Sequence, residues 1–211
     1  MVAGTWRAGP SCIAPTVANL LVTAAKSENA PTTPALAASL CQSCHGAHGE
    51  GSPGAAIPRL AGQSAAYLEK QLKDYAAGTR DNTIMSQFAK RLSSPELASL
   101  AAYYASLNSP ILPAARGGTA SAQSRGHLLA HLADESHRVE ACDNCHGPDG
   151  NGATRTAPYL AGQSSQYLTA ALNAWKQGTR KNDDGKLMQS VVDRLDANDI
   201  AAIAAYFSNL D

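Results

Sequence analysis

The sequence predicts an all-α fold made of two tandem units. The 211-residue chain aligns with itself at an offset of about 100 residues, which divides it into two similar halves. Each half carries apolar residues at helical spacing, bounded by residues typical of helix ends. Neither half contains an alternating apolar and polar run long enough for a strand. The fold class therefore follows from an internal duplication of a helical unit.

The duplication is evident in short stretches that are identical in the two halves. The matched stretches are Leu60–Ser64 with Leu160–Ser164, Gly78–Arg80 with Gly178–Arg180, and Arg91–Leu92 with Arg194–Leu195. They predict a first domain over residues 31–110 and a second over 123–211. Residues 111–122 contain Pro113 and a Gly pair and are predicted as a linker. Residues 1–30 form a separate N-terminal segment.

Three helical elements are expected in each half. Short apolar segments at Ala35–Leu40 and His127–Leu132 form the first pair. The second pair begins at N-cap residues Ser64 and Ser164 and is terminated by a glycine. The apolar stripes of this second pair are Leu68, Leu72 and Tyr75 in one copy and Leu168, Leu172 and Trp175 in the other.

The third pair of helices ends each half. The first copy opens with Ser94 as the expected N-cap, followed by Pro95, and the second opens with Asp196. Both helices are rich in alanine, which allows another helix to approach closely.

A Cys-x-x-Cys-His motif occurs once in each half, at 41–45 and 142–146. This motif is the attachment signature of a c-type haem. On one helical turn the two thiols and the imidazole share a face, so the thiols can bond to the porphyrin while the imidazole reaches the iron. We therefore expect two covalently bound haem c groups. The predicted attachments are Cys41, Cys44, Cys142 and Cys145, and the predicted axial histidines are His45 and His146.

Two other uses of these cysteines are chemically open. Close Cys-x-x-Cys pairs also form redox dithiols, and two pairs together could supply four zinc ligands. Neither use accounts for the histidine that follows both pairs. The fifth cysteine, Cys12, is expected to be a spare thiol, because the apolar run follows it where a lipoprotein signal would need the run to precede it.

Methionines Met85 and Met188 are the predicted sixth ligands of the two irons. Each lies about 40 residues after the histidine of its own half, in the expected loop between the second and third helices. A thioether opposite an imidazole favours reduced iron and suits electron transfer. With both axial positions filled, oxygen or peroxide has no place to bind, so the sequence predicts an electron-transfer protein and no enzyme.

The axial histidine also requires a hydrogen-bond acceptor for its second ring nitrogen. Pro58 and Pro158 are placed where a backbone carbonyl could serve, although they could also simply shape the loop. The remaining histidines are not expected to bind iron. They are His48, His127, His131 and His137.

Charge and hydropathy restrict the partners. Lysine plus arginine and aspartate plus glutamate both number 17, and no block of like charge suggests a nucleic-acid partner. No stretch reaches the roughly 20 apolar residues of a membrane-spanning helix. Residues Ile13–Ala25 have the length of the apolar region of a secretory signal. The N-terminal segment is therefore expected to be a signal or an anchor remnant.

With these motifs together, the chain resembles the dihaem class I cytochromes c, particularly the cytochrome c-four type, over about residues 35–211. The ordered set is Cys-x-x-Cys-His-Gly, Pro-x-Leu-Ala-Gly-Gln, Tyr-Leu, Gly-Thr-Arg, a methionine and an alanine-rich last helix, and it occurs twice. The resemblance implies two class I cytochrome c domains packed across a pseudo-twofold interface, with the haem propionate edges near each other. It assigns Cys41, Cys44, His45 and Met85 to the first haem, Cys142, Cys145, His146 and Met188 to the second, and the carbonyl role to Pro58 and Pro158.

The resemblance also implies a function and a compartment. Such proteins are periplasmic, soluble or peripherally attached to the inner membrane. They relay single electrons from respiratory donors to a terminal oxidase or another acceptor, so redox proteins are the expected partners. One alternative is a cytochrome subunit of a dehydrogenase or oxidase complex. Another is a haem enzyme such as a dihaem peroxidase or a thiosulfate-oxidising cytochrome.

Overall fold

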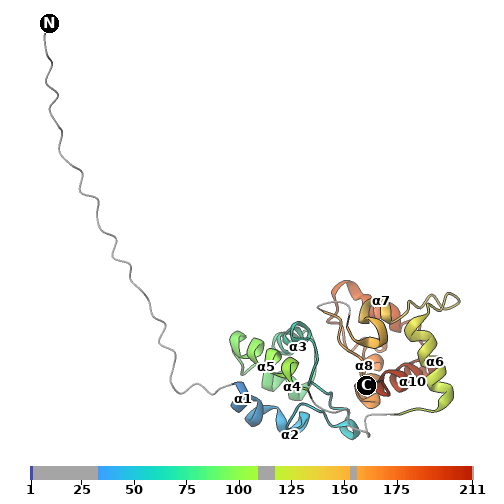
Figure 1. Ribbon diagram of the computed structural model, residues 1–211, viewed down its shortest axis with the longest axis horizontal. Helices are drawn as coiled ribbons and strands as arrows, with labels where there is room; N and C mark the ends of the chain where they lie inside the picture. Colours follow the sequence, from blue (N-terminus) through green and yellow to red (C-terminus); the bar gives the residue numbers. More distant parts are fainter. Residues whose placement is uncertain (2–32, 109–116, 153–155, 211) are drawn as a thin grey trace. The chain divides into compact units, whose positions relative to one another are not determined.

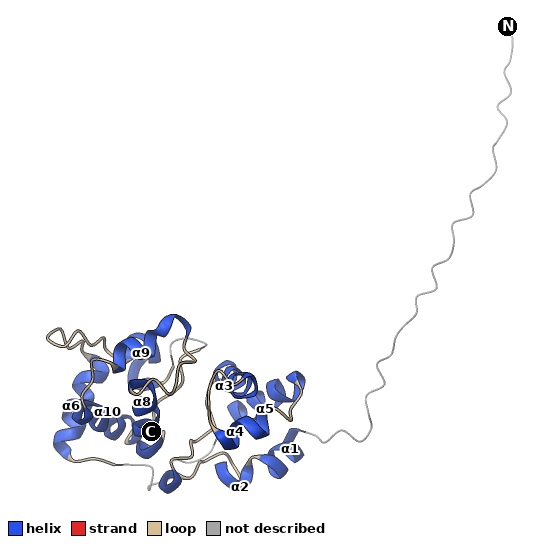
Figure 2. Ribbon diagram, turned by 180° about the vertical axis from the view of Figure 1, so that it is seen from behind, coloured by secondary structure: helices blue, strands red, loops and turns tan. Residues whose placement is uncertain are grey.

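A computed structural model describes Met1 and residues 33–108, 117–152 and 156–210. The described part contains helices and isolated β-bridges but no strand (Figures 1 and 2). Both halves belong to one compact unit, Pro31–Asp211. The predicted N-terminal segment with Cys12 lies outside the described residues, apart from Met1. In the described ranges, no helix is both long and apolar enough to cross a membrane.

The two halves contain corresponding helices. The first half has α1 (Thr33–Leu40), α2 (Gln42–His45), η1 (Pro53–Ala55), α3 (Ala65–Ala77), α4 (Thr83–Ala89) and α5 (Ser94–Ser106). The second half has α6 (Ala120–His131), α7 (Asp143–His146), η3 (Pro148–Gly150), α8 (Ser165–Lys176), η4 (Asp184–Lys186), α9 (Leu187–Val192) and α10 (Ala197–Ser208).

Helices α3 and α8 begin as the sequence predicts. The hydroxyl of Ser64 accepts from the backbone N–H of Tyr67, and Ser164 does the same for Tyr167. Gly78 ends α3 with a φ of 77°, a conformation that costs glycine little. Local capping chemistry therefore fixes both helix starts.

The predicted start of α5 is wrong by one residue. The N-cap is Ser93, and a capping box joins it to Glu96 through a Ser93 N–H to Glu96 Oε2 bond of 2.7 Å. Ser94 is the first helical residue, because a serine three positions before a glutamate can complete the box. Helix α10 has the expected N-cap, Asp196.

The methionines do not lie in simple loops, which corrects the expectation for this region. Met85 lies in α4 and Met188 in α9, each a short helix. The side chain of Asn82 accepts from the Met85 N–H at 2.9 Å, and Asp183 accepts from the Met188 N–H at 2.7 Å. A side chain that accepts from the methionine's own N–H thus stabilises the first turn of each helix, and in α4 this side chain is the N-cap.

The first helices of the halves differ in length. Helix α6 begins at Ala120, inside the stretch predicted as a linker, and is longer than α1. It packs closely on α10, since a Cβ at Gly126 would lie 2.5 Å from Cβ of Tyr206. Small residues such as Gly126 thus permit α6 to approach α10 closely, as expected from the alanine content of the last helix. The domain boundaries remain predictions.

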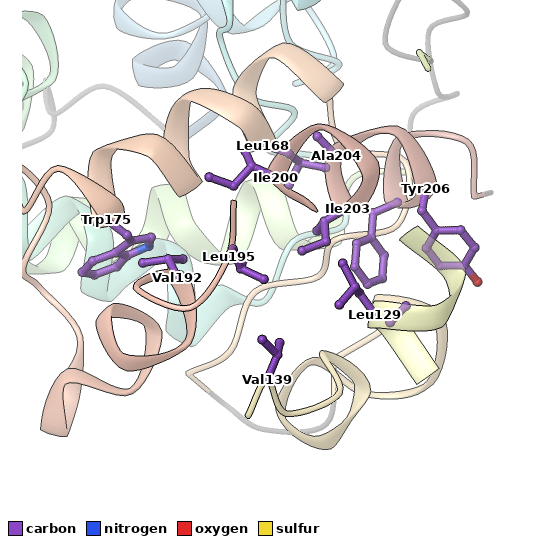
Figure 3. Close-up of a cluster of buried hydrophobic side chains, with 12 residues drawn as sticks. Leu129, Val139, Leu168, Trp175, Val192, Leu195, Ile200, Ile203, Ala204 and Tyr206 are labelled. Carbon is purple, nitrogen blue, oxygen red and sulfur yellow. The ribbon is translucent and has the colours of Figure 1, made fainter. Parts of the chain in front are cut away.

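Each half has its own core, and the two cores differ in size. The first is formed by Leu36, Ala37, Leu68, Leu100, Ala101 and Tyr104. The second is formed by Leu129, Ala130, Val139, Leu168, Trp175, Val192, Leu195, Ile200, Ile203, Ala204, Tyr206 and Phe207 (Figure 3). The first half therefore has the greater need for a buried apolar cofactor.

Candidate haem-binding sites

The motif cysteines and histidines lie on two single-turn helices, α2 and α7. His45 N–H donates to the Cys41 carbonyl at 3.0 Å, and His146 N–H donates to that of Cys142 at 2.9 Å. This turn places the first cysteine and the histidine on the same face. None of the four motif cysteines forms a disulfide: Cys44 and Cys145 are exposed, and the other two are half-buried. Free thiols beside an imidazole are what haem c attachment requires.

Both imidazoles are oriented by a backbone carbonyl. Nδ1 of His45 lies 2.9 Å from the Pro58 oxygen, and Nδ1 of His146 lies 2.8 Å from the Pro158 oxygen. The carbonyl can only accept, so Nδ1 carries the hydrogen and Nε2 keeps its lone pair. The sites therefore present the tautomer that binds a metal.

The burial of these groups favours their neutral forms. His45 and His146 are each 7% exposed. Burial lowers the pKa of both imidazoles, although the proline carbonyls act in the opposite direction. Burial also raises the pKa of the Cys142 thiol to about 12. A neutral thioether is compatible with the same surroundings.

Glycines let the loop after each motif pass close to the proline carbonyl. Gly51 has a φ of 82°, and a Cβ there would lie 2.7 Å from the Arg59 nitrogen and 2.8 Å from the Pro58 carbonyl carbon. Gly152 occupies the corresponding place with a φ of 83°. Cysteines outside disulfides, a metal-binding tautomer and a closely approaching loop together fit a covalently attached haem in each half.

The candidate methionines are placed less directly. Both side chains are half-buried, and Met188 packs against the second core. Each lies on the short helix that follows the second main helix of its half. This arrangement is consistent with an axial role, and the assignment of Met85 and Met188 remains a prediction.

Two glutamines that the sequence-based assignment missed join the halves. Gln163 Oε1 accepts from the Arg59 N–H at 2.9 Å, and its Nε2 donates to the Arg59 carbonyl at 3.0 Å. Gln63 makes the same pair with Tyr159, at 2.8 and 3.0 Å. Both glutamines lie in the repeated Leu-Ala-Gly-Gln-Ser stretch, and this repetition is the sequence feature that could have pointed to them.

Arginines of the repeated Gly-Thr-Arg stretch form a second part of this contact. Arg80 and Arg180 are linked by an isolated antiparallel bridge. Arg80 donates to the Tyr167 hydroxyl, and Arg180 donates to that of Tyr67, both at 3.2 Å. Burial alone would raise the pKa of Tyr167, but the two guanidiniums lower it to about 8. The contact is therefore electropositive around this phenol.

A third set of bonds across the contact is not reciprocal. Asn182 Nδ2 donates to Asp74 Oδ2 at 2.6 Å and to Gln71 Oε1 at 2.9 Å, and Lys70 Nζ donates to the Asn182 carbonyl at 2.7 Å. In the second half, the residues matching Lys70, Gln71 and Asp74 are all alanines: Ala170, Ala171 and Ala174. Among the described residues, these bonds hold the methionine segment of the second half, and no matching set holds that of the first half.

Two of the other histidines, His131 and His137, have polar side-chain partners. His131 lies 2.7 Å from a carboxylate oxygen of Asp143 and 2.7 Å from the Tyr206 hydroxyl, and His137 lies 3.0 Å from Asp134. Among the described residues, no group of three or more histidines, cysteines and carboxylates could hold a metal ion. Their exclusion as iron ligands remains a prediction.

Known proteins match both halves. The cytochrome c family model matches residues 34–108 and 135–211. The chain is 42% identical to the thiosulfate dehydrogenase electron acceptor of Stutzerimonas stutzeri over 174 residues, covering 82% of this chain and 80% of that relative. The crystal structure of reduced cytochrome c4 from Pseudomonas stutzeri matches with a TM-score of 0.76 and 30% identity, over 86% of this chain and all of that chain (100%).

A thiosulfate dehydrogenase (TsdBA) from Marichromatium purpuratum also matches, with a TM-score of 0.72 and 38% identity. The match covers 81% of this chain but only 36% of that longer chain. These matches confirm the predicted all-α fold of two tandem cytochrome c domains. The chain belongs to the cytochrome c family, as a cytochrome c4-type electron carrier with two covalently bound haem c groups.

Proposed function

We propose that the chain relays single electrons from a respiratory donor to a terminal oxidase or another redox protein through two haems with histidine and methionine ligands. The main supporting observation is the buried imidazole in each half, which has a fixed tautomer and lies one helical turn after a cysteine that forms no disulfide. Haem iron supplies the one-electron redox chemistry. Both halves have this arrangement, so two relay sites follow.

The protein residues have distinct roles in this proposal. Cys41, Cys44, Cys142 and Cys145 hold the two groups covalently. His45 and His146 would each bind the iron through a ring nitrogen, and Met85 and Met188 would each bind it through a thioether sulfur. The carbonyls of Pro58 and Pro158 keep each imidazole in the binding tautomer. If both methionines bind iron, no position is left for a substrate, which would disfavour the alternative of a peroxidase or a thiosulfate-oxidising enzyme.

A thiosulfate dehydrogenase is the class of donor that the relatives favour. The name of the Stutzerimonas relative describes an acceptor of its electrons, and the Marichromatium structure is a thiosulfate dehydrogenase that contains a similar region. This support also fits the alternative of a cytochrome subunit in a dehydrogenase complex. We place the protein in the periplasm, where such partners and haem attachment occur, and mass spectrometry of the mature N-terminus would test export.

The ligand assignment is tested by replacing the methionines one at a time. In the untreated protein both haems should be low-spin in both oxidation states and should not bind carbon monoxide. Met85→Ala or Met188→Ala should open one site to carbon monoxide and lower the potential of that haem, because the thioether stabilises reduced iron. Spectroelectrochemistry measures both effects. A high-spin haem in the untreated protein would contradict the proposal.

The donor is tested by stopped-flow reduction. Thiosulfate with a catalytic amount of thiosulfate dehydrogenase should reduce the oxidised protein, while thiosulfate alone should not. If thiosulfate alone sustains turnover, the protein is an enzyme. Copurification at native concentration separates a permanent complex subunit from a diffusing carrier.

A further inference from the structure

In each candidate site, one peptide group links the histidine to a glutamine of the opposite half by hydrogen bonds. The Pro58 carbonyl accepts from His45, and the N–H of the same peptide group, which belongs to Arg59, donates to Gln163. Both distances are 2.9 Å. In the other direction, His146 donates to the Pro158 carbonyl, and the Tyr159 N–H donates to Gln63, both at 2.8 Å. Each imidazole is thus two hydrogen bonds away from a glutamine of the opposite half.

Hydrogen bonds in such a chain strengthen one another. A peptide group that donates through its N–H becomes a better acceptor at its oxygen, particularly in surroundings of low dielectric constant. The two glutamines are only 7% and 5% exposed, so little water competes. A stronger acceptor at Nδ1 makes the other imidazole nitrogen more basic, which favours oxidised iron. The opposite half can therefore influence the electronic state of each axial ligand.

The glutamines are themselves held in place. Oε1 of Gln63 also accepts from the Ser64 N–H at 2.9 Å, and Gln163 does the same with Ser164 at 3.0 Å. These serines are the N-caps of α3 and α8. Each glutamine is thus fixed to the start of a main helix of its own half. Its side-chain amide also bonds to one residue of the other half, accepting from the N–H of that residue and donating to its carbonyl.

We propose that Gln63 and Gln163 are positioning residues that act across the contact, each on the axial histidine of the opposite half. Gln163 tunes His45, and Gln63 tunes His146. The inference rests on the proposed function, in which these histidines bind iron. Docking of the two halves then sets both reduction potentials, since each half completes the hydrogen-bond chain of the other.

The test is made with Gln63→Leu and Gln163→Leu in the full-length holoprotein. Gln163→Leu should raise the potential of the first haem and shift the paramagnetic NMR resonances of the His45 ring, while the second haem is unchanged. Gln63→Leu should do the reverse. The double variant should move both haems. Met85→Ala and Met188→Ala identify which signals belong to which haem.

Gln71→Ala is the matched control for a loosened contact. It removes the bonds of Gln71 to Arg180 and Asn182, touches neither proline peptide and reproduces the alanine found at 171. Gln71→Ala should not shift only the haem of the opposite half, which is the crossed pattern expected of the two leucine variants. The inference is overturned if each leucine variant moves the haem of its own half, moves both haems equally or moves neither.

Two further measurements keep the test decisive. If a leucine variant does not fold, Gln→Asn at the same position keeps the polarity but shortens the reach, and it should give the same crossed shift. If the untreated protein lacks iron-bound histidine resonances, the proposed function itself fails. If those resonances are present and the shifts are not crossed, only this inference fails.

Discussion

The local backbone conformation determines which ring nitrogen of the histidine is available to bind a metal. The Pro58 carbonyl selects the His45 tautomer, and Gly51 lets the chain pass beside that carbonyl. At a φ of 82°, any residue other than glycine is strained. The conformation of Gly51 therefore supports the orientation of His45, the proposed iron ligand of the first half.

Gly51→Ala should destabilise the protein by about 1–3 kcal/mol, because the added Cβ would clash with the peptide of Pro58 and Arg59. The same clash should perturb the first haem through His45. Denaturant unfolding and the potential of the first haem are the measurements. Gly54→Ala is the control, since a Cβ there meets nothing within 4 Å. An equal free energy of unfolding and an equal potential of the first haem in the two variants would contradict this explanation.

The two short methionine helices are held by different means. Asn82 is the N-cap of α4, whereas the matching Asn182 bonds to α3 of the opposite half. In α9, Asp183 accepts from the Met188 N–H. A local insertion in the second copy frees Asn182 for this contact. The methionine segments of the two halves are therefore inequivalent although the sequence repeats.

Lys70→Ala combined with Asp74→Ala should loosen the segment that carries Met188 and leave that of Met85 intact. Both substitutions reproduce the alanines at 170 and 174, so α3 itself should persist. We expect the second haem to lose its methionine ligand at a denaturant concentration lower by the equivalent of about 1–2 kcal/mol. Optical titration of the ferric protein follows this loss.

A second double variant controls for charge removal on the same helix. Glu69 and Lys73 form an i, i+4 ion pair on α3, and the Lys73 side chain is 53% exposed. Glu69→Ala with Lys73→Ala should therefore have little effect on either haem. An equal loss of the methionine ligand in both double variants would mean that α3 stability, and not the contact with Asn182, is responsible.

Local signals made some elements predictable and left others hidden. The limits of α3 follow from Ser64 and Gly78, which act on adjacent backbone. Helices α4 and α9 escaped prediction because they are too short for apolar periodicity and depend on a single cap. The roles of Gln63 and Gln163 escaped because their partners lie about 100 residues away, and no local pattern reveals such a pairing.

The cofactors and the unequal cores should together determine the stability of the molecule. The described core of the first half has half as many buried residues as that of the second. The second half also contains the longer first helix, α6, packed on α10. The first half should therefore depend more strongly on its haem for folding.

Preventing attachment in one half at a time tests this dependence. Cys41→Ala with Cys44→Ala should unfold much of the first half, whereas Cys142→Ala with Cys145→Ala should leave more protected backbone in the second. Hydrogen exchange measured by mass spectrometry resolves the two halves. Equal loss of protection in both variants would show that core size does not govern the response.

The reciprocal glutamine bonds have the form of an isologous dimer interface, in which one patch pairs with its own equivalent. The covalent connection between the halves then contributes a high effective concentration of partners. Substitutions on either side of the patch are consequently constrained by the other copy. After gene duplication, such a pair of domains can diverge freely on their outer surfaces, while the residues of the patch must change together.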